Sequence, residues 1–309
     1  MSEFKTVGIV GGGLIGMSWA SLFLARGCEV IVVDPNPDAR IQLQDFLPKA
    51  WDNLTALGLT GADMAPQPTV TDDYLALRHV DFIQENGPEQ LAAKLAIIAQ
   101  LEQVIRSEVV IASSTSSLCA SDMQAGARSP ERILVAHPMN PPHLVPMVEL
   151  VAGRETSEAT VATAERFYAK MERVCIRVKR EVPGHLANRL TSALFREAVH
   201  LVAEGIADVE DVDKAIAYGP GLRWALMGPH LTYHLGGGQG GYRGYLENLG
   251  PSQEERWKSL GNPKLSEAVK AKLIAGVEDE LVDLDEATLI ERRDAALVEI
   301  LKLKAAHRL

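Results

Sequence analysis

Cysteine and positive charge are both scarce in this sequence. Its three cysteines, Cys28, Cys119 and Cys175, are widely spaced and odd in number, which excludes a disulfide framework and a Cys-x-x-Cys metal clip. This cysteine usage suits a reducing compartment, so we expect a cytoplasmic protein without a structural metal. Acidic residues outnumber basic ones by 41 to 31, which gives a formal net charge of −10. Neither nucleic acid nor an anionic membrane surface is therefore an expected partner.

A convincing membrane-spanning segment is also missing. The stretch from Thr6 to Ala25 carries no charged residue and is long enough to suggest one. However, it contains four glycines within six residues, and Arg26 follows directly. The basic start and small-residue cleavage site of a signal peptide are not evident either. We predict instead a buried strand, a glycine turn and a core-facing helix.

The 309 residues are enough for two domains, and the first of them begins with a dinucleotide-binding pattern. Residues 5–10 form a short, largely apolar run rich in β-branched side chains, which predicts a buried strand. A predicted helix covers about residues 14–26, and a second strand covers residues 29–33. This strand–helix–strand order is typical of a Rossmann unit.

The glycine turn inside this unit predicts a site for the pyrophosphate of the cofactor. Gly11 allows the tight turn, Gly13 lets the pyrophosphate approach backbone N–H groups, and Gly16 lets the helix pack against the strand. Leu14 and Ile15 complete the motif and begin the helix. We therefore predict cofactor contacts along the whole turn.

An acidic residue at the end of the second strand indicates which dinucleotide is bound. Asp34 lies where a carboxylate accepts hydrogen bonds from the adenosine ribose, and its charge would repel a 2′-phosphate. Arg40 is the only nearby residue that could serve such a phosphate. The sequence thus predicts NAD rather than NADP as the cofactor.

Two further strands are predicted to end in polar residues at the same edge of the sheet. Glu89 follows the strand 81–84 and is expected to open a helix that runs to about residue 105. The strand 109–113 ends in five consecutive hydroxyl residues, 113–117. Such a run often caps a helix, but five hydroxyls exceed what one cap needs, so we expect at least one to contact a substrate oxygen.

A proline-rich stretch between residues 136 and 150 provides candidate acid–base chemistry. Its four prolines exclude a continuous helix, so the strand 133–136 must loop over and return as a second extended run, 145–151. This return brings His137 and Glu149 close together. A carboxylate beside an imidazole fixes its tautomer and stabilises the imidazolium. A structural histidine next to an unrelated glutamate would fit this segment alone equally well.

Four motifs in this order resemble the L-3-hydroxyacyl-CoA dehydrogenase family. They are the glycine turn with its acidic residue, the Ser-Thr-Ser-Ser run, the His-Pro-x-Asn-Pro stretch with its glutamate, and Val182-Pro-Gly-His-Leu-Ala-Asn-Arg189. The resemblance implies a Rossmann-type doubly wound α/β domain over residues 1–183. It further implies an all-helical domain over residues 184–309 that binds substrate and forms a homodimer.

The resemblance also assigns roles to individual residues. The catalytic pair falls on His137 and Glu149, and the substrate-polarising residues fall on Ser116 and Asn188. Beyond the glycine turn and its acidic residue, the cofactor contacts fall on Glu89, Lys94 and Asn140. The implied reaction is hydride transfer from a substrate C–H to NAD⁺ while the histidine removes the hydroxyl proton.

The segment after the second strand bears on the substrate. An acyl-CoA site needs lysine or arginine clusters for its phosphates, and this family commonly places them here. Residues 37–72 contain only Arg40 and Lys49 as basic residues, against several aspartates. A CoA thioester is therefore disfavoured, although a short-chain 3-hydroxyacyl-CoA dehydrogenase stays an alternative.

The helical half resembles a free-standing branch of the family instead. This branch includes L-carnitine dehydrogenase and the L-gulonate 3-dehydrogenase/λ-crystallin proteins, which oxidise small 3-hydroxy acids. The stretch 218–233 is closer to the carnitine type, whereas Pro138-Met139-Asn140-Pro141-Pro142 is closer to the gulonate type. Carnitine dehydrogenases often have phenylalanine in the position of Met139. A crystallin-like protein without activity is a further alternative, but all four catalytic side chains are present.

Substrate contacts are predicted in both halves of the chain. Trp224 and Tyr233 offer aromatic faces to a quaternary ammonium group, and Met139 lies beside the proposed catalytic pair. Arg223 would bind a substrate carboxylate, although a structural ion pair explains it equally well. The glycine-rich segment 236–241 is expected to be a connector or, less simply, a mobile lid.

Overall fold

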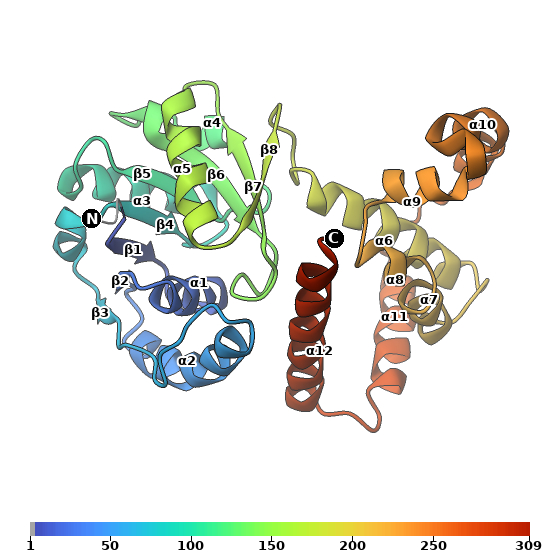
Figure 1. Cartoon of the computed structure of the whole chain (residues 1–309), viewed down its shortest axis with the longest axis horizontal. Helices are drawn as coiled ribbons and strands as arrows, with labels where there is room; N and C mark the ends of the chain where they lie inside the picture. The colour runs from blue at the N-terminus through green and yellow to red at the C-terminus, as the bar shows by residue number, and fades with distance from the viewer. Residues whose placement is uncertain (1–3) are drawn as a thin grey trace. The chain divides into compact units, whose positions relative to one another are not determined.

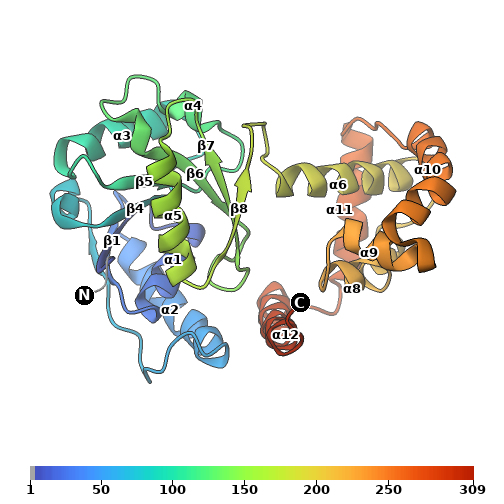
Figure 2. The ribbon, with the colours of Figure 1, turned by 45° about the horizontal axis from the view of Figure 1, so that its top comes forward.

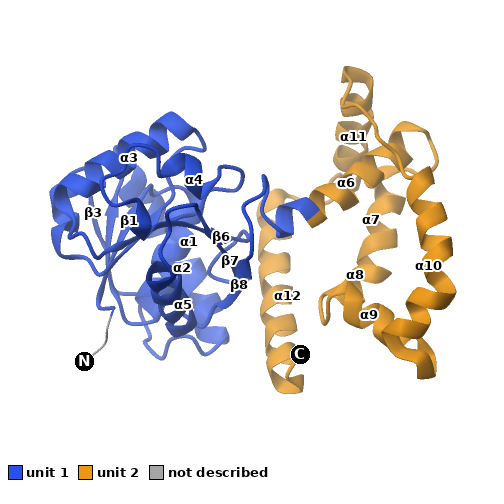
Figure 3. Cartoon of the chain, turned by 90° about the horizontal axis from the view of Figure 1, so that it is seen from above, with its two compact units in different colours: residues 1–189 blue, residues 190–309 orange. Residues whose placement is uncertain are grey.

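The computed structural model describes residues 4–309, and the chain divides into two compact units, residues 1–189 and 190–309 (Figure 3). The boundary predicted from the sequence, between residues 183 and 184, lies in the turn that precedes α6 (Ala187–Ala203). The first turn of that helix belongs to the first unit.

The first unit is built on an eight-stranded sheet with the order β3-β2-β1-β4-β5-β6-β7-β8. All neighbouring pairs are parallel except β6 and β7, which are antiparallel. The strands are β1 (Thr6–Val10), β2 (Glu29–Val33), β3 (Thr69–Thr71), β4 (Phe82–Glu85), β5 (Val110–Ser113), β6 (Ile133–Pro138), β7 (Met147–Ala152) and β8 (Val174–Val178). Because the parallel strands β1, β4 and β5 end together, their following loops meet at one edge of the sheet.

Helices cover both faces of this sheet (Figures 1 and 2). They are α1 (Leu14–Ala25), α2 (Ala39–Ala56), α3 (Leu91–Val104), α4 (Ala120–Met123), α5 (Glu158–Lys170) and the short 3₁₀ segments η1 (Tyr74–His79) and η2 (Pro130–Arg132). One core cluster includes buried side chains of α1, α2 and α5, and the other includes those of α3 and α4. Aromatic rings fill the first cluster, where Phe82 stacks on Phe167 with centroids 3.8 Å apart. The Rossmann-type fold predicted from the sequence is confirmed.

The start of α3 differs from the expectation. This helix begins at Leu91 with Gln90 at its N-cap, so Glu89 precedes the helix and does not open it. The carboxylate of Glu89 instead accepts hydrogen bonds from the serine-rich loop after β5. The backbone of Gln90 is extended, with φ −135° and ψ 126°, so Glu89 lies outside the helix.

The predicted return of the chain after the prolines is an antiparallel pair, β6 and β7. His137 and Glu149 are directly opposite each other in its register. The loop between the strands is held by the guanidinium of Arg173, which donates to the carbonyl of Pro142 at 3.1 Å. Arg173 is buried, and burial lowers its pKa to about 10.

The second unit is entirely helical. After α6 it contains α7 (Val209–Ala217), α8 (Pro220–Trp224), α9 (Pro229–Gly236), η3 (Gly238–Gly240), α10 (Gly241–Ser259), α11 (Glu267–Glu280) and α12 (Glu286–His307). The glycine-rich segment thus connects α9 to α10 through one 3₁₀ turn. Among residues 4–309, no helix combines the length and apolar character needed to cross a membrane.

Candidate active site

The glycine turn after β1 leaves room where a pyrophosphate is expected. Gly11 has φ +92°, and a Cβ there would lie 2.5 Å from the carbonyl oxygen of Asn86. A Cβ on Gly16 would lie 1.9 Å from the carbonyl oxygen of Gly11. By contrast, a Cβ on Gly13 would meet nothing within 4 Å. Because α1 begins at Leu14 without a side-chain cap or an acidic first turn, its N-terminal N–H groups suit an anion.

Asp34 stabilises the glycine turn from the end of β2. Its Oδ2 accepts from the N–H of Gly12 at 2.5 Å, and its Oδ1 accepts from the N–H of Asn36 at 2.7 Å. Arg40, the candidate for a 2′-phosphate, donates to the carbonyl of Val70 at 2.8 Å. The residues present therefore fit NAD.

A buried ion pair holds the loop after β4. Both side chains, Glu85 and Lys94, are about 1% exposed. The Nζ of Lys94 donates to the two carboxylate oxygens of Glu85 at 3.1 and 2.9 Å and to the carbonyl of Gly87 at 3.2 Å. Ser113 also donates to Glu85, at 2.5 Å. Lys94 thus has a clear structural contact, while its contact with the cofactor stays a prediction.

Glu89 anchors the loop that follows β5. Its Oε1 accepts from the hydroxyl of Thr115 at 2.7 Å, from the N–H of Ser116 at 2.9 Å, and from both the N–H and the hydroxyl of Ser117. Desolvation alone would raise the pKa of this carboxyl, but the hydrogen bonds from Thr115 and Ser117 outweigh it, so its pKa is lowered. Glu89 is therefore an anion that organises the loop.

The hydroxyl run 113–117 has one member with a free side chain. Ser113 donates to Glu85, and Ser114 donates to Asn86 at 2.7 Å. Thr115 and Ser117 donate to Glu89. Among residues 4–309, the exposed hydroxyl of Ser116 has no hydrogen-bond partner in the structure. The expectation that one hydroxyl exceeds the needs of the fold is consistent with this arrangement.

His137 and Glu149 form a buried, directed pair. The Nδ1–H of His137 donates to Oε2 of Glu149 at 2.8 Å. The other oxygen of Glu149 accepts from the N–H groups of Leu186 and Ala187 at 2.8 and 2.9 Å. Burial would raise the pKa of Glu149, but its hydrogen bonds from His137, Ala187 and Leu186 lower it overall. A carboxylate that accepts from Nδ1 leaves Nε2 of the neutral imidazole as a proton acceptor.

Asn188 follows directly after the two residues whose N–H groups donate to Glu149. It lies in the first turn of α6 and donates from Nδ2 to the carbonyl of Ser116 at 3.3 Å. The structure thus places Ser116, His137, Glu149 and Asn188 around the same edge of the sheet, although they come from four different segments. In the loop after β6, Met139 is half-buried and Asn140 is exposed.

Sequence reasoning missed His185 as a member of this region. Its imidazole is 1% exposed, and its ring centroid lies 5.2 Å from that of His137. Its Nε2 donates to the carbonyl of Thr115 at 3.1 Å. The available signal was a histidine between Gly184 and Leu186, directly before the motif residue Asn188, but spacing alone did not link it to His137.

The remaining substrate candidates belong to the second unit. Arg223 and Trp224 end the short helix α8, and Trp224 is 39% exposed. Tyr233 stacks on Tyr245 with ring centroids 4.4 Å apart, and its pKa is raised by burial and by Tyr245. Their contacts with substrate stay predictions.

Comparisons with known proteins identify the family. A sequence model described as "3-hydroxyacyl-CoA dehydrogenase, NAD binding domain" matches residues 6–182, and one described as "3-hydroxyacyl-CoA dehydrogenase, C-terminal domain" matches residues 184–273. The chain belongs to the 3-hydroxyacyl-CoA dehydrogenase family. It is an NAD-dependent oxidoreductase, as the glycine turn and Asp34 predict.

Within the 3-hydroxyacyl-CoA dehydrogenase family, named relatives match almost the whole chain. An L-carnitine dehydrogenase of Streptomyces coelicolor is 44% identical over 96% of this chain and 94% of its own length. One of Bacillus cereus is 41% identical over 98% and 93%. A solved structure of a 5-formyl-3-hydroxy-2-methylpyridine 4-carboxylic acid 5-dehydrogenase, an NAD⁺-dependent dismutase, has a TM-score of 0.84 at 27% identity, covering 97% of this chain and 98% of that one.

Proposed function

We propose that this protein oxidises the 3-hydroxyl of L-carnitine to the corresponding ketone with NAD⁺. The observation that carries this proposal is the near full-length similarity to proteins named L-carnitine dehydrogenase, combined with the His137–Glu149 pair. The stretch 218–233, which resembles the carnitine type, supports the same assignment. Whether the protein is of the carnitine type or of the gulonate type, its substrate is a small polar 3-hydroxy acid.

His137 is the proposed base. Its Nε2 takes the hydroxyl proton of the substrate, while Glu149 holds Nδ1 and stabilises the imidazolium that forms. Because Glu149 also accepts two backbone N–H groups, the ring has a fixed direction before substrate binds. In the reverse reaction the same imidazolium returns the proton to the alkoxide.

Ser116 and Asn188 are proposed to hydrogen-bond the substrate oxygen as its charge changes. Ser116 has its hydroxyl available, and the side-chain amide of Asn188 is held beside it by a hydrogen bond from Nδ2 to the carbonyl of Ser116. Donors that are already in place stabilise a developing oxyanion at little reorganisation cost.

The cofactor contacts are proposed to lie along the glycine turn, at Asp34, at Glu89 and Lys94, and at Asn140. NAD⁺, when bound, accepts the hydride from the substrate carbon. The protein holds the pyrophosphate at the start of α1 and the ribose at Asp34, which itself shapes the turn through Gly12.

A free acid is favoured over a CoA thioester by the charge of residues 37–72. This segment, which includes α2, contains five aspartates and only two basic residues, Arg40 and Lys49. Arg40 is already bonded to the carbonyl of Val70. CoA phosphates would therefore meet mainly negative charge here. The carboxylate of a free acid is proposed to contact Arg223, and a trimethylammonium group is proposed to contact Trp224 and Tyr233, with Met139 beside the reacting carbon.

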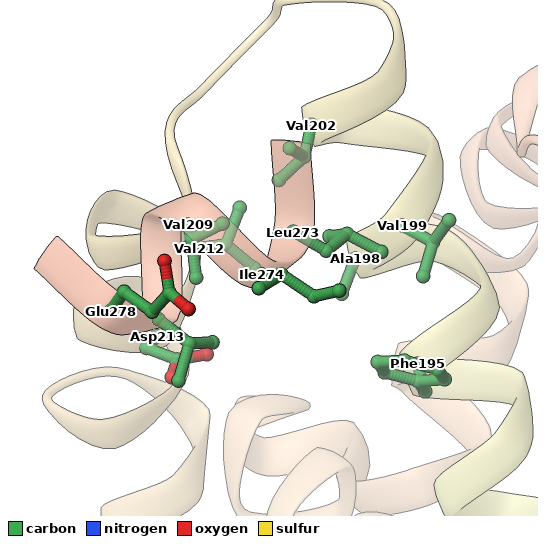
Figure 4. Close-up of a pocket in the computed structure, with 11 residues that line it drawn as sticks. Phe195, Ala198, Val199, Val202, Val209, Val212, Asp213, Leu273, Ile274 and Glu278 are labelled. Atoms are coloured by element: carbon green, nitrogen blue, oxygen red, sulfur yellow. The ribbon is translucent and has the colours of Figure 1, made fainter. Parts of the chain in front are cut away.

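We also propose a homodimer through the helical unit. Of its apolar side chains, those that are buried are Val199, Val202, Val212, Tyr245 and Val298. Side chains of α6, α7 and α11 line an apolar cavity of about 440 Å³ (Figure 4). Among them, Phe195 and Ile274 are each 58% exposed. A unit with so little buried apolar surface is stabilised by a second apolar surface, and a second copy supplies one.

The cysteine usage supports a cytoplasmic location, because the three cysteines are widely spaced and odd in number.

The direct test is NADH production from L-carnitine, L-gulonate, 3-hydroxybutyrate and 3-hydroxybutyryl-CoA, followed by absorbance. We expect the highest kcat/KM with L-carnitine. Activity on L-gulonate alone would move the protein to the other type of this branch. Activity on the CoA ester alone would overturn the proposal and the argument from the acidic segment.

A further inference from the structure

We propose that His185 is a positioning residue that holds the Ser116 loop against His137, and that it acts only as a neutral imidazole. This inference rests on the proposed function, because it concerns the same proton-accepting histidine. His185 itself is not the proton acceptor; it acts through its neighbours.

The hydrogen bond of His185 fixes its tautomer. A carbonyl oxygen can only accept, so the contact with Thr115 at 3.1 Å requires a proton on Nε2 of His185. The carbonyl of Thr115 belongs to the peptide bond that leads into Ser116. The side chain of His185 therefore sets the position of the residue whose hydroxyl is free.

The other ring nitrogen of His185 disfavours a second proton. Nδ1 is buried and, among the residues that the structure describes, has no hydrogen-bond partner. Protonating it would create a buried cation with an unsatisfied N–H. Burial is also the largest cause that lowers the pKa of His185, and the nearby His137 lowers it further, whereas Thr115, Glu149 and Glu89 oppose the shift.

The backbone around His185 is consistent with a constrained role. Its φ of +50° is in the left-handed region, which a histidine adopts at a cost. The following N–H groups of Leu186 and Ala187 donate to Glu149, and the side chain of Asn188 donates to Ser116. One turn of chain thus contacts the serine loop and the catalytic carboxylate together, with the His185 ring beside His137 between them.

A set of three variants separates the hydrogen bond from simple packing. His185→Phe keeps a ring but has no N–H. His185→Gln has an amide that reaches the position of Nε2 and does not titrate. His185→Asn tolerates the left-handed backbone but is too short to reach Thr115. We expect kcat to fall about tenfold or more in the Phe and Asn variants and to recover to within about threefold of wild type in the Gln variant. NADH binding should change by less than about twofold in all three, because the glycine turn is untouched.

The pH profile supplies a readout that packing alone would not move. Because both imidazoles must be neutral, wild-type kcat/KM should fall more steeply towards acid pH than that of His185→Gln, which has only one such group. The titratable groups that face His185 are His137, Glu149 and Glu89, and all three are retained in the Gln variant. Equal slopes, or a Phe variant with wild-type kcat, would overturn the proposal.

A measurement without substrate separates this proposal from the proposed function. Nitrogen-15 NMR of labelled histidine should show His185 as the neutral Nε2–H tautomer at pH about 6, with its signals assigned by their loss in the Gln variant. An Nδ1–H tautomer, or a protonated ring at pH about 7, would overturn the role of His185 whatever the substrate. If L-carnitine is not oxidised, the kinetic comparison is made with the 3-hydroxy acid that is.

Discussion

At the scale of single residues, the acid–base chemistry depends on which nitrogen of His137 carries the proton. Glu149 accepts from Nδ1 and is itself held by two backbone N–H groups, so Nε2 is directed away from the carboxylate. A glutamine side chain fills similar space but cannot accept the substrate proton.

For His137→Gln we expect kcat to fall by about 10²- to 10⁴-fold, the usual contribution of a general base. The Kd of NADH, measured by fluorescence titration, should stay nearly constant because the proposed pyrophosphate and ribose contacts, at the glycine turn and Asp34, do not include His137. Turnover close to that of wild type would remove His137 from the mechanism.

Asp34 is expected to set the selectivity for NAD over NADP and also to stabilise the glycine turn. Asp34→Ser should narrow the preference for NAD over NADP, since the charge that repels a 2′-phosphate is lost. It should also raise the KM for NAD, since the bond to Gly12 is weakened. Asp34→Asn is the matched control, because its amide oxygen can still accept from Gly12. An unchanged NAD/NADP ratio of kcat/KM in both variants would show that another residue sets the preference.

At the scale of elements, the buried pair of Glu85 and Lys94 connects β4 to α3. Lys94→Met leaves the Glu85 carboxylate buried without its cation, so we expect the free energy of unfolding to fall by about 3–5 kcal/mol. Adding Glu85→Gln to that variant should recover part of the loss. Urea denaturation gives the free energy of unfolding of the single and the double variant. If Lys94→Met alone were as stable as wild type, the loop after β4 would not depend on this pair.

The loop after β5 should be sensitive to acid. The folded-state pKa of Glu89 is lowered, so its contribution to stability is fully present above the ordinary carboxyl pKa of 4.5 and is lost as pH falls through the lower folded-state value. The folded-state pKa of Glu149 is also lowered, so its contribution to stability is likewise lost as pH falls. In Glu89→Gln, the fall of Tm between pH about 5 and about 3 should be smaller than in wild type. Parallel Tm curves would contradict this reading of Glu89.

At the scale of the whole molecule, the apolar surface of the helical unit predicts self-association. Ile274→Glu places a charge in the apolar cavity of α6, α7 and α11, so we expect the dimer to dissociate at low micromolar concentration. Analytical ultracentrifugation gives the mass. Met64→Glu is the matched control, because Met64 is 80% exposed in the first unit, outside the proposed interface. A wild-type protein that sediments as a monomer would refute the dimer.

The sequence by itself determined the first unit and its cofactor. The glycines, the apolar runs and Asp34 act locally, through turn geometry, burial and helix N-termini. Their structural roles can therefore be predicted from a short stretch of sequence. The strands β3 and β8 were not predicted, because β3 has three residues and β8 is only partly buried, so neither has a distinctive pattern.

Only the tertiary structure decided which polar groups are already occupied. The hydroxyl run looked uniform in sequence, yet Glu85, Asn86 and Glu89 take four of its members and leave Ser116. Lys94 proved to be buried against Glu85, and His185 proved to lie beside His137. These outcomes depend on distances between segments far apart in the chain, because a hydrogen bond needs its partner within about 3 Å and sequence spacing does not encode that distance.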